Sequence, residues 1–298
     1  MKLAIVYSTA AAALALLSAS GGHAVSDPSG ARCDAPPVRF GAARVYSVDR
    51  EVDVHFTCSG AVLAGTLYLP SGPGRHPAVV WVHGSGEATR LTYGGFVAAF
   101  VNSGIAVFSY DKRGVGASQG VCCPGDESHF NLLAADADGA VNALRSRTDI
   151  DPRRIGLVGA SQAGWIVPLA ADRSRHRVAF TALISGPAVT TGEEALWSRL
   201  AGEDEPGRLP KAKKAEITRR LVPSGYDPLP SIARMDVPGL WLYGGQDKSI
   251  PAERSAAVLR RLRGSQGKDF TVVVFPDGDH NLAASVPTLV RWVAARTS

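Results

Sequence analysis

A serine with small neighbours stands where this chain could carry a nucleophile. Ser161 lies in the segment 159–164, which reads G-A-S-Q-A-G, between an apolar run over 155–158 and a segment of helical spacing that begins near Trp165. A serine at such a strand-to-helix turn is held strained and exposed, and its neighbours are small because the turn brings the backbone close. The motif therefore predicts a nucleophile elbow, although Ala163 occupies the place of the second glycine in G-x-S-x-G.

A serine hydroxyl needs a base to take its proton, and the base needs an acid to orient it. His280 follows the last predicted strand in a loop at the carboxyl edge of the sheet, where the reactive groups of open α/β sheets collect. Asp247 directly follows the strand before it and is predicted to orient His280. Asp277 and Asp279 are alternatives for the acid, but neighbours on the same loop rarely reach the correct ring nitrogen. The chain order of nucleophile, acid and base is that of α/β-hydrolases.

An oxyanion hole is predicted from the glycine-rich turn over 83–86, which reads H-G-S-G and follows the apolar run over 78–82. Fixed amide donors stabilise the negative charge of a tetrahedral intermediate, and losing one costs roughly 3 kcal/mol. The predicted donors are the backbone N–H groups of Ser85 and Gln162. His83 is a rival base, but its position beneath this turn favours a structural hydrogen bond.

The elements that must position these residues follow from the hydrophobic pattern. Short, nearly continuous apolar runs indicate buried parallel strands, at 78–82, 105–109, 155–158, 179–184, 240–243 and 270–275. Segments of helical spacing lie between them, at 96–102, 132–145, 165–171, 252–262 and 286–295. Two alternating runs, 52–57 and 62–69, predict an antiparallel hairpin. The fold class is thus α/β, a mostly parallel sheet with an antiparallel N-terminal hairpin and helices on both faces.

Several of these stretches carry a family resemblance. They are the end of the hairpin over 63–70, the turn at His83, the segment 111–118 (D-K-R-G-V-G-A-S), the elbow with Gln162, and the loops at Asp247 and His280. Together they resemble bacterial α/β-hydrolase-fold serine hydrolases of the dienelactone hydrolase-like and prolyl oligopeptidase-like branch. That branch includes esterases, acyl hydrolases and serine peptidases, so the resemblance implies the fold and the triad more strongly than a substrate.

The same resemblance implies where the segment 111–118 lies. It places this segment beside the oxyanion turn, with Arg113 able to neutralise a buried carboxylate and with both Arg113 and Asp111 in structural roles. Dienelactone hydrolases proper use a cysteine nucleophile. Because Ser161 departs from that pattern, their lactone activity is not expected here.

The N-terminal residues predict export. Lys2 precedes an apolar, alanine-rich run over 3–17, and small residues around Ala24 suit a signal peptidase. We expect a cleaved signal peptide over 1–24, an N-terminal extension over 25–44 and one hydrolase domain over 45–298. A charged, Pro/Gly-rich stretch over about 187–232 without a strand-like run is predicted to be a small helical cap insertion. The mature protein is expected to be secreted or periplasmic, without a membrane span.

The four cysteines, Cys33, Cys58, Cys122 and Cys123, all lie beyond the predicted cleavage site. An even number in an oxidising compartment favours disulfides, but the sequence leaves the pairing open. A zinc site from Cys122, Cys123 and His129 lacks the two-residue gap that lets a chelating pair converge on one ion. We expect neither a metal nor an organic cofactor, because the backbone amides of the predicted oxyanion hole supply the electrostatic stabilisation that a metal would otherwise provide.

The net charge of the chain bears on which partners can be expected. The chain has 32 Lys+Arg and 27 Asp+Glu, a formal net charge of +5, which is too small and scattered to indicate a nucleic-acid partner. The sequence predicts a monomeric, exported serine hydrolase that cleaves small-molecule carboxylic esters through an acyl-enzyme. One alternative is a serine peptidase of short peptides, with an acidic pair such as Glu193 and Glu194 binding a free N-terminus. Another is a non-catalytic binding protein on a hydrolase scaffold.

Overall fold

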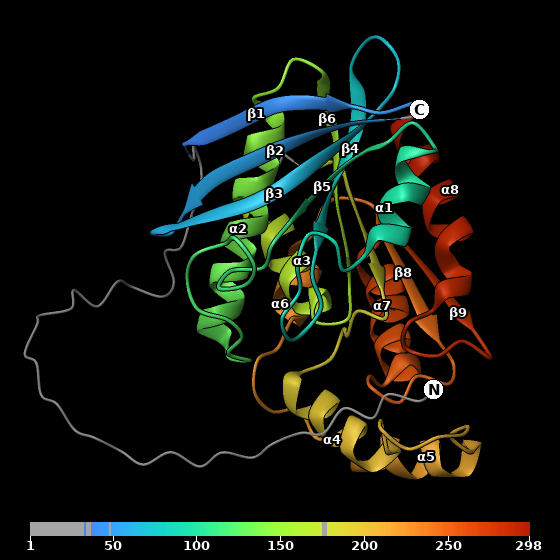
Figure 1. Cartoon of the computed structure of the whole chain (residues 1–298). Coiled ribbons are helices and arrows are strands. Elements are labelled where there is room, and N and C mark those ends of the chain that lie inside the picture. The colour runs from blue at the N-terminus through green and yellow to red at the C-terminus, as the bar shows by residue number, and fades with distance from the viewer. Residues whose placement is uncertain (1–32, 34–36, 48, 175–177) are drawn as a thin grey trace, which may run out of the picture.

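The computed structural model describes residue 33 and residues 37–47, 49–174 and 178–298. The predicted signal peptide over 1–24 lies outside these residues. Within them, nine strands form one sheet in the order β1-β2-β3-β5-β4-β6-β7-β8-β9 (Figure 1). Their bounds are β1 Val38–Val45, β2 Asp49–Cys58, β3 Ala61–Pro70, β4 His76–Val82, β5 Ala106–Tyr110, β6 Ile150–Ala160, β7 Phe180–Ile184, β8 Gly239–Gly244 and β9 Phe270–Phe275.

The strand directions confirm the predicted fold class. The first strands, β1, β2, β3 and β5, pair antiparallel in turn, and every pair from β5 through β4 to β9 is parallel. The central strands are buried along almost their whole length, which is why they read as continuous apolar runs. The parallel arrangement brings the carboxyl ends of β4, β6, β7, β8 and β9 to one edge of the sheet.

The N-terminal hairpin is present, and one further strand precedes it. Ser59 and Gly60 join β2 to β3, both with positive φ, 44° and 75°, as a tight hairpin turn requires. β1 begins at Val38, within the expected N-terminal extension, and pairs with β2. Its residues are mostly exposed, so it lacks the alternation of apolar and polar side chains that marks a half-buried strand.

Helices cover both faces of the sheet (Figure 1). α1 Gly94–Val101 and α8 Val286–Thr297 pack on one face, where their buried side chains join one core cluster. On the other face lie α2 Glu127–Arg145, α3 Ala163–Arg173 and α7 Ala252–Gln266, whose side chains belong to a second, larger cluster. Among the helices described, none combines the length and the apolar character needed to cross a lipid bilayer.

The expected insertion is helical and lies beyond the carboxyl edge of the sheet. It contains α4 Thr191–Ala201, α5 Lys211–Arg220 and α6 Leu229–Arg234. α4 and α5 share a small apolar core of their own, formed around Trp197 and Ile217, and lie below the main body in Figure 1. α6 instead packs with Ile232 in the main core. The cap therefore consists of α4, α5 and the loops around them.

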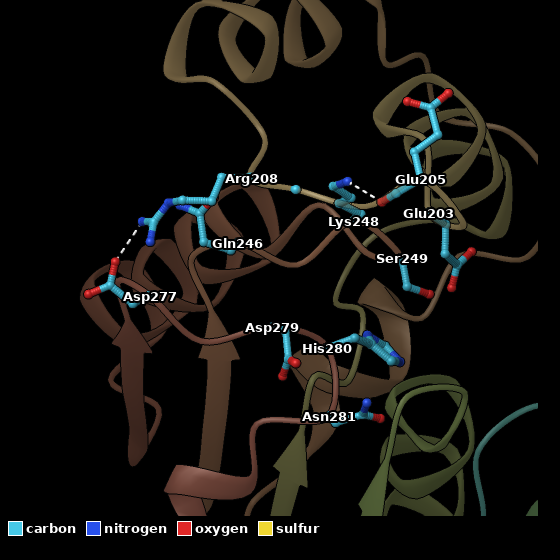
Figure 2. A pocket seen from close by; sticks show the side chains of 11 residues that line it. Glu203, Glu205, Arg208, Gln246, Lys248, Ser249, Asp277, Asp279, His280 and Asn281 are labelled. Atoms are coloured by element: carbon cyan, nitrogen blue, oxygen red, sulfur yellow. Dashed lines mark hydrogen bonds and ion pairs between the residues drawn. The ribbon is translucent and has the colours of Figure 1, made fainter. Parts of the chain in front are cut away.

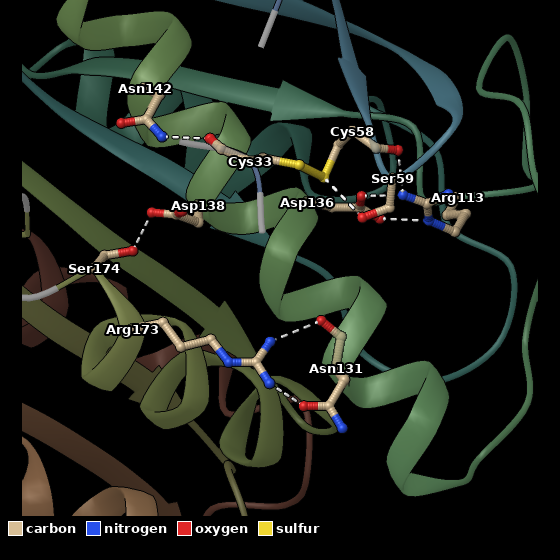
Figure 3. The surroundings of a disulfide bond; sticks show 10 residues. All are labelled: Cys33, Cys58, Ser59, Arg113, Asn131, Asp136, Asp138, Asn142, Arg173 and Ser174. Carbon is tan, nitrogen blue, oxygen red and sulfur yellow. Dashed lines mark hydrogen bonds and ion pairs between the residues drawn. A yellow bond between two sulfur atoms is a disulfide. The ribbon is translucent and has the colours of Figure 1, made fainter. Parts of the chain in front are cut away.

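A disulfide and a buried ion pair lie next to each other between the end of β2 and α2 (Figure 3). Cys33 pairs with Cys58 at the end of β2, across 25 residues of chain. Beside it the guanidinium of Arg113 forms a bidentate pair with Asp136 of α2 and donates to the carbonyl of Cys58 at 2.9 Å. The buried carboxylate that the resemblance implied for Arg113 is thus Asp136, which is fully buried.

Candidate active site

The predicted elbow has the strained backbone that its role requires. Ser161 follows β6 and has φ of +54°, in the left-handed region that a non-glycine residue rarely adopts. Its N–H donates to the carbonyl of Ile184 in β7, which fixes the turn against the neighbouring strand. Small residues are needed on both sides, because a Cβ on Gly159 would lie 2.5 Å from the Cβ of Ala163. Ala163 therefore fills the space next to a glycine, and the departure from G-x-S-x-G leaves the turn intact.

The loops after β8 and β9 bring His280 and Asp247 together. Nδ1 of His280 lies 2.8 Å from Oδ2 of Asp247. The other carboxylate oxygen of Asp247 accepts the backbone N–H groups of Ser249 and Ile250 at 2.8 and 2.9 Å. Asp247 is 2% exposed. Its carboxylate is therefore held in the interior, and these hydrogen bonds fix its orientation. The arrangement matches a base held by an acid.

The two alternative acids lie elsewhere. Asp277 is exposed and pairs with Arg208 of the cap loop at 2.6 Å. Asp279 accepts the backbone N–H of Leu282 at 3.0 Å, inside its own loop. Asp247 is therefore the carboxylate that the fold places against His280.

The surroundings of His280 favour its protonated form. Burial alone would lower the pKa of its imidazole, but the hydrogen bond and charge of Asp247, with the charges of Glu203 and Glu194, outweigh burial and raise the pKa above its usual 6.5. Such an environment favours proton acceptance by His280, because it stabilises the charged form of the imidazole.

The glycine-rich turn after β4 lies against the elbow, as expected. A Cβ on Gly84 would lie 3.3 Å from the Cβ of Ser161 and 3.1 Å from the hydroxyl of Tyr93. A side chain at this position would press on both neighbours, so a glycine suits this close approach. The backbone of the predicted donor Ser85 thus directly follows a residue in contact with the predicted nucleophile, and the second predicted donor, Gln162, follows the nucleophile itself.

His83 is not suited to act as the base. It is 2% exposed, and its Nε2 is hydrogen-bonded to the carbonyl of Tyr110. Burial lowers the pKa of its imidazole to about 4. The ring also stacks on Tyr93 with centroids 5.7 Å apart. These contacts agree with the expected structural role.

Lys112 is a residue that sequence reasoning missed. Its ammonium is buried behind the oxyanion turn, where it donates to the carbonyls of Gly84 and Gly86 at 2.8 and 3.1 Å and to Oε1 of Gln162 at 2.8 Å. Burial lowers the pKa of Lys112 to about 8. The available signal was its place directly after β5, at the carboxyl edge of the sheet.

Two cavities meet at His280. The first, which we call the apolar cavity, has a volume of about 580 Å³ and is lined by Ser161 and His280 together with mainly apolar side chains, Tyr93, Phe96, Ile184 and Val286 among them. Its size falls in the range of small-molecule sites. The predicted nucleophile and base therefore border the same space.

The second, which we call the polar cavity, has a volume of about 310 Å³ and lies between the cap and the loops after β8 and β9. Figure 2 shows the charged and polar side chains around it, with His280 and Asn281 on the side shared with the first cavity. The ammonium of Lys248 donates to the carbonyl of Glu205 at 2.6 Å. Together with the Arg208–Asp277 ion pair, this contact joins the cap to the main body.

The acidic pair considered for peptide binding is divided. The side chain of Glu193 forms the capping box of α4 with Thr190 and an ion pair with Arg254. Glu194 is partly buried on the site's side. Burial, and then the charge of Glu203, raise the pKa of its carboxyl to about 7, while the nearby His280 acts in the opposite direction.

The remaining cysteines bond to each other. Cys122 pairs with its neighbour Cys123, so this disulfide joins no second segment of the chain. It lies in the loop after the Arg113 turn, and Sγ of Cys122 is 3.9 Å from the carbonyl of Gly86.

Comparison with known proteins agrees with this geometry. Residues 74–224, about half of the chain, match the family Hydrolase_4, described as serine aminopeptidase, S33. The chain belongs to this family. Its resemblance to α/β-hydrolase-fold serine hydrolases is thereby confirmed, and this Hydrolase_4 protein is a hydrolase of that fold.

Two sequence relatives illustrate the breadth of the similarity. An uncharacterized protein of Mycobacterium tuberculosis is 28% identical over 241 residues, covering 80% of this chain and 75% of the relative. The esterase EstD of Thermotoga maritima is 26% identical over 246 residues, covering 73% of this chain and 57% of the esterase.

Solved structures share the fold. Acetyl xylan esterase 1 from Thermoanaerobacterium superposes with a TM-score of 0.63 and 19% identity, covering 89% of each chain. The carboxylesterase EstE1, cloned from a metagenomic library, has a TM-score of 0.64 and 18% identity, covering 86% of this Hydrolase_4 protein and 92% of EstE1.

Proposed function

We propose that this protein is a serine hydrolase that cleaves carboxylic esters through an acyl-enzyme, with Ser161 as nucleophile, His280 as base and Asp247 as the acid that orients it. One observation carries the proposal. A serine in the left-handed conformation of an elbow and a histidine bonded to a buried aspartate border one apolar cavity.

The steps follow from this arrangement. Oγ of Ser161 attacks the ester carbonyl while its proton passes to Nε2 of His280, whose Nδ1–H donates to Asp247. The backbone N–H groups of Ser85 and Gln162 stabilise the tetrahedral oxyanion. The carbon–oxygen bond to the alcohol then breaks, and His280 returns the proton to the departing alcohol. Water, deprotonated by His280, attacks the acyl-enzyme, and release of the acid regenerates Ser161.

The chemistry of the two cavities supports a proposal for where each part of the ester binds. Apolar walls favour an alkyl or aryl acyl group, because its burial removes apolar surface from water. The polar cavity, with Glu203, Lys248 and Asp279 on its walls, suits a leaving group that keeps hydrogen bonds. We propose esters of an apolar acid and a polar alcohol as the preferred substrates.

Export is part of the proposal. A disulfide between Cys33 and Cys58 supports an oxidising compartment, because thiols stay reduced in the cytosol. The test is the size and location of the protein after expression in a secreting host. Recovery outside the cytosol with the N-terminal segment removed is expected, whereas a full-length cytosolic product would contradict it.

The activity is tested with matched nitrophenyl esters of short and medium acyl length, alongside aminoacyl nitroanilides. We expect ester turnover that falls at least about 1,000-fold in Ser161→Ala, since little more than the oxyanion hole and binding remain. Ser265→Ala, an exposed serine on α7, is the matched control and should keep wild-type turnover. Ester turnover that survives in Ser161→Ala would overturn the mechanism.

A second candidate is a serine peptidase, and Glu194 is the observation that favours it. Its partly buried carboxylate lies close enough to His280 and Asp247 for their charges to act on it, and a carboxylate there can bind a substrate ammonium. Anilide turnover above ester turnover, with KM raised in Glu194→Gln, would move the assignment to a peptidase.

A further inference from the structure

The ammonium of Lys112 makes three hydrogen bonds, all of them to the segments that form the predicted oxyanion hole. A lysine ammonium has three N–H donors and no acceptor. Here the acceptors are the carbonyls of Gly84 and Gly86 and the side-chain oxygen of Gln162, at 2.8, 3.1 and 2.8 Å. The side chain is 2% exposed. A buried ammonium bound only by neutral oxygens is costly to maintain, which calls for a reason.

The bond to Gly84 fixes the direction of the first predicted donor. The C=O of Gly84 and the N–H of Ser85 belong to one planar trans peptide unit and point in opposite directions. Holding the carbonyl on the ammonium therefore holds the N–H of Ser85 pointing away from it. Because hydrogen-bonded groups polarise one another, a cation on the carbonyl also makes that N–H a stronger donor.

The bond to Gln162 holds the second predicted donor. Gln162 follows Ser161 and stands at the N-cap of α3, and it is 6% exposed. Its side chain is fixed from behind the oxyanion turn by the same ammonium. Lys112 thus connects two segments, from the loops after β4 and β6, that are far apart along the chain.

We propose that Lys112 is a positioning residue of the oxyanion hole, which holds the backbone N–H groups of Ser85 and Gln162 in one fixed geometry. The inference rests on the proposed function. It distinguishes Lys112 from its neighbour Arg113, whose guanidinium binds Asp136 and the carbonyl of Cys58 away from the turn.

The test compares Lys112→Met with wild type on a nitrophenyl ester and on two inhibitors. One inhibitor is an alkyl boronic acid, which forms a tetrahedral adduct with Ser161, and the other is the unreactive amide analogue of the ester. We expect kcat to fall by about 100-fold, as loss of one oxyanion donor does, with KM changed less than about twofold. The Ki of the boronic acid should rise by at least about tenfold while that of the amide stays the same.

The matched control is Lys268→Met. Lys268 is also mostly buried and also donates to a backbone carbonyl, that of Met235 at 2.8 Å, but it precedes β9 at the opposite edge of the sheet. This control should keep the wild-type kcat and boronic acid Ki. A purely structural role of Lys112 would instead lower the melting temperature and weaken both inhibitors together.

A milder variant keeps the proposal open to refutation if Lys112→Met fails to fold. Gln162→Ala retains the backbone donor and removes only the side-chain acceptor. We expect a smaller fall in kcat, of about tenfold. The double variant should be no worse than Lys112→Met alone, because the Gln162 side chain acts only through its contact with Lys112. Wild-type kcat and boronic acid Ki in a folded Lys112→Met would overturn the inference, and so would the same result in Gln162→Ala where Lys112→Met does not fold.

A separate measurement distinguishes failure of the proposed function from failure of the inference about Lys112. If no ester is turned over, the rate at which a fluorophosphonate labels Ser161 replaces kcat, because that reaction also places charge on an oxygen at the same donors. Labelling of wild type that is slowed in Lys112→Met would support the inference and reject only the substrate class. Absence of labelling in folded wild type would overturn both.

Discussion

Two adjacent cations of one loop have opposite surroundings. Lys112 and Arg113 both follow β5 and are 2% and 4% exposed. Lys112 donates only to neutral oxygens at the oxyanion turn and the elbow. Arg113 binds the carboxylate of Asp136 and the carbonyl at Cys58, next to the disulfide, as Figure 3 shows.

The difference separates the proposed catalytic region from a structural region. An ion pair such as Arg113–Asp136 neutralises both charges locally, so removing one partner is felt as lost stability. A buried charge at the oxyanion turn, or a pair such as His280 and Asp247 that borders a cavity, acts on the groups at which we propose that a substrate binds. We therefore expect substitutions in the structural region to lower stability, and substitutions in the proposed catalytic region to lower the rate of ester turnover.

The largest effect is expected on the catalytic side, in Asp247→Asn. An asparagine turns an amide N–H toward Nδ1 of His280 and favours the wrong tautomer, so kcat/KM for an ester should fall by about 10,000-fold, or about 5.5 kcal/mol. The asparagine oxygen can still accept the N–H groups of Ser249 and Ile250. The melting temperature should therefore fall by less than about 4 °C. A large loss of stability with retained kcat would place Asp247 on the structural side.

The pH profile sharpens the same comparison. As the proposed base, His280 must be neutral to accept a proton, and its pKa is raised above 6.5 because Asp247, Glu203 and Glu194 outweigh the effect of burial. The kcat/KM of wild type should therefore rise with pH around a midpoint above 6.5. Removing the Asp247 charge should move the midpoint of the residual activity to lower pH. An unchanged midpoint in Asp247→Asn would show that another group controls the profile.

The next largest effect is expected on the structural side, in Arg113→Met. This change leaves Asp136 fully buried without its cation and should lower the free energy of unfolding by about 4 kcal/mol, measured by urea denaturation. Burial already raises the pKa of Asp136 to about 6, and loss of Arg113 raises it further. The folded variant then binds more protons than the unfolded chain, so its stability should fall as pH rises from about 5 to 8.

A double variant controls for the loss of packing around Arg113. Arg113→Met combined with Asp136→Leu removes both charges and should recover most of the lost stability. The kcat of the folded Arg113→Met protein should stay close to wild type. A fall in kcat as large as that of Lys112→Met would erase the distinction between the two cations.

The smallest of the three effects is expected for the disulfide beside Arg113. Replacing Cys33 and Cys58 by serine releases a crosslink over 25 residues, which should lower the free energy of unfolding by roughly 3.5 kcal/mol. The matched control replaces Cys122 and Cys123, which are adjacent and close no loop of chain. Equal losses from both pairs, measured by the same denaturation, would contradict the loop-closure explanation.

Local patterns were sufficient to predict most of the elements. The buried parallel strands are continuous apolar runs, and the hairpin turn has residues that tolerate positive φ, so both are readable from neighbouring residues alone. β1 was missed because its side chains are mostly exposed and carry no period. Helix ends extended beyond the predicted ranges, as in α2, which begins at Glu127 behind the N-cap Asp126.

The residues of the candidate site that were predicted are those that follow a strand readable from the local sequence. Ser161, Asp247 and His280 each follow a recognisable strand, and parallel strands bring their carboxyl ends to one edge. Lys112 was missed because its importance comes from acceptors that lie 26 to 50 residues away along the chain. Likewise, only the packing of the cap separates Glu193, bound to Arg254, from Glu194 near His280.

The sequence by itself predicted most of the strands and helices along the chain, the elbow at Ser161 and the candidate base and acid, because each depends on a short stretch of chain. The tertiary structure alone decided that Cys33 pairs with Cys58, that the carboxylate paired with Arg113 is Asp136, that Lys112 is bound by neutral oxygens, and that an apolar and a polar cavity meet at His280. These features depend on contacts between segments distant in sequence, where packing and burial set the charge and shape that a substrate meets.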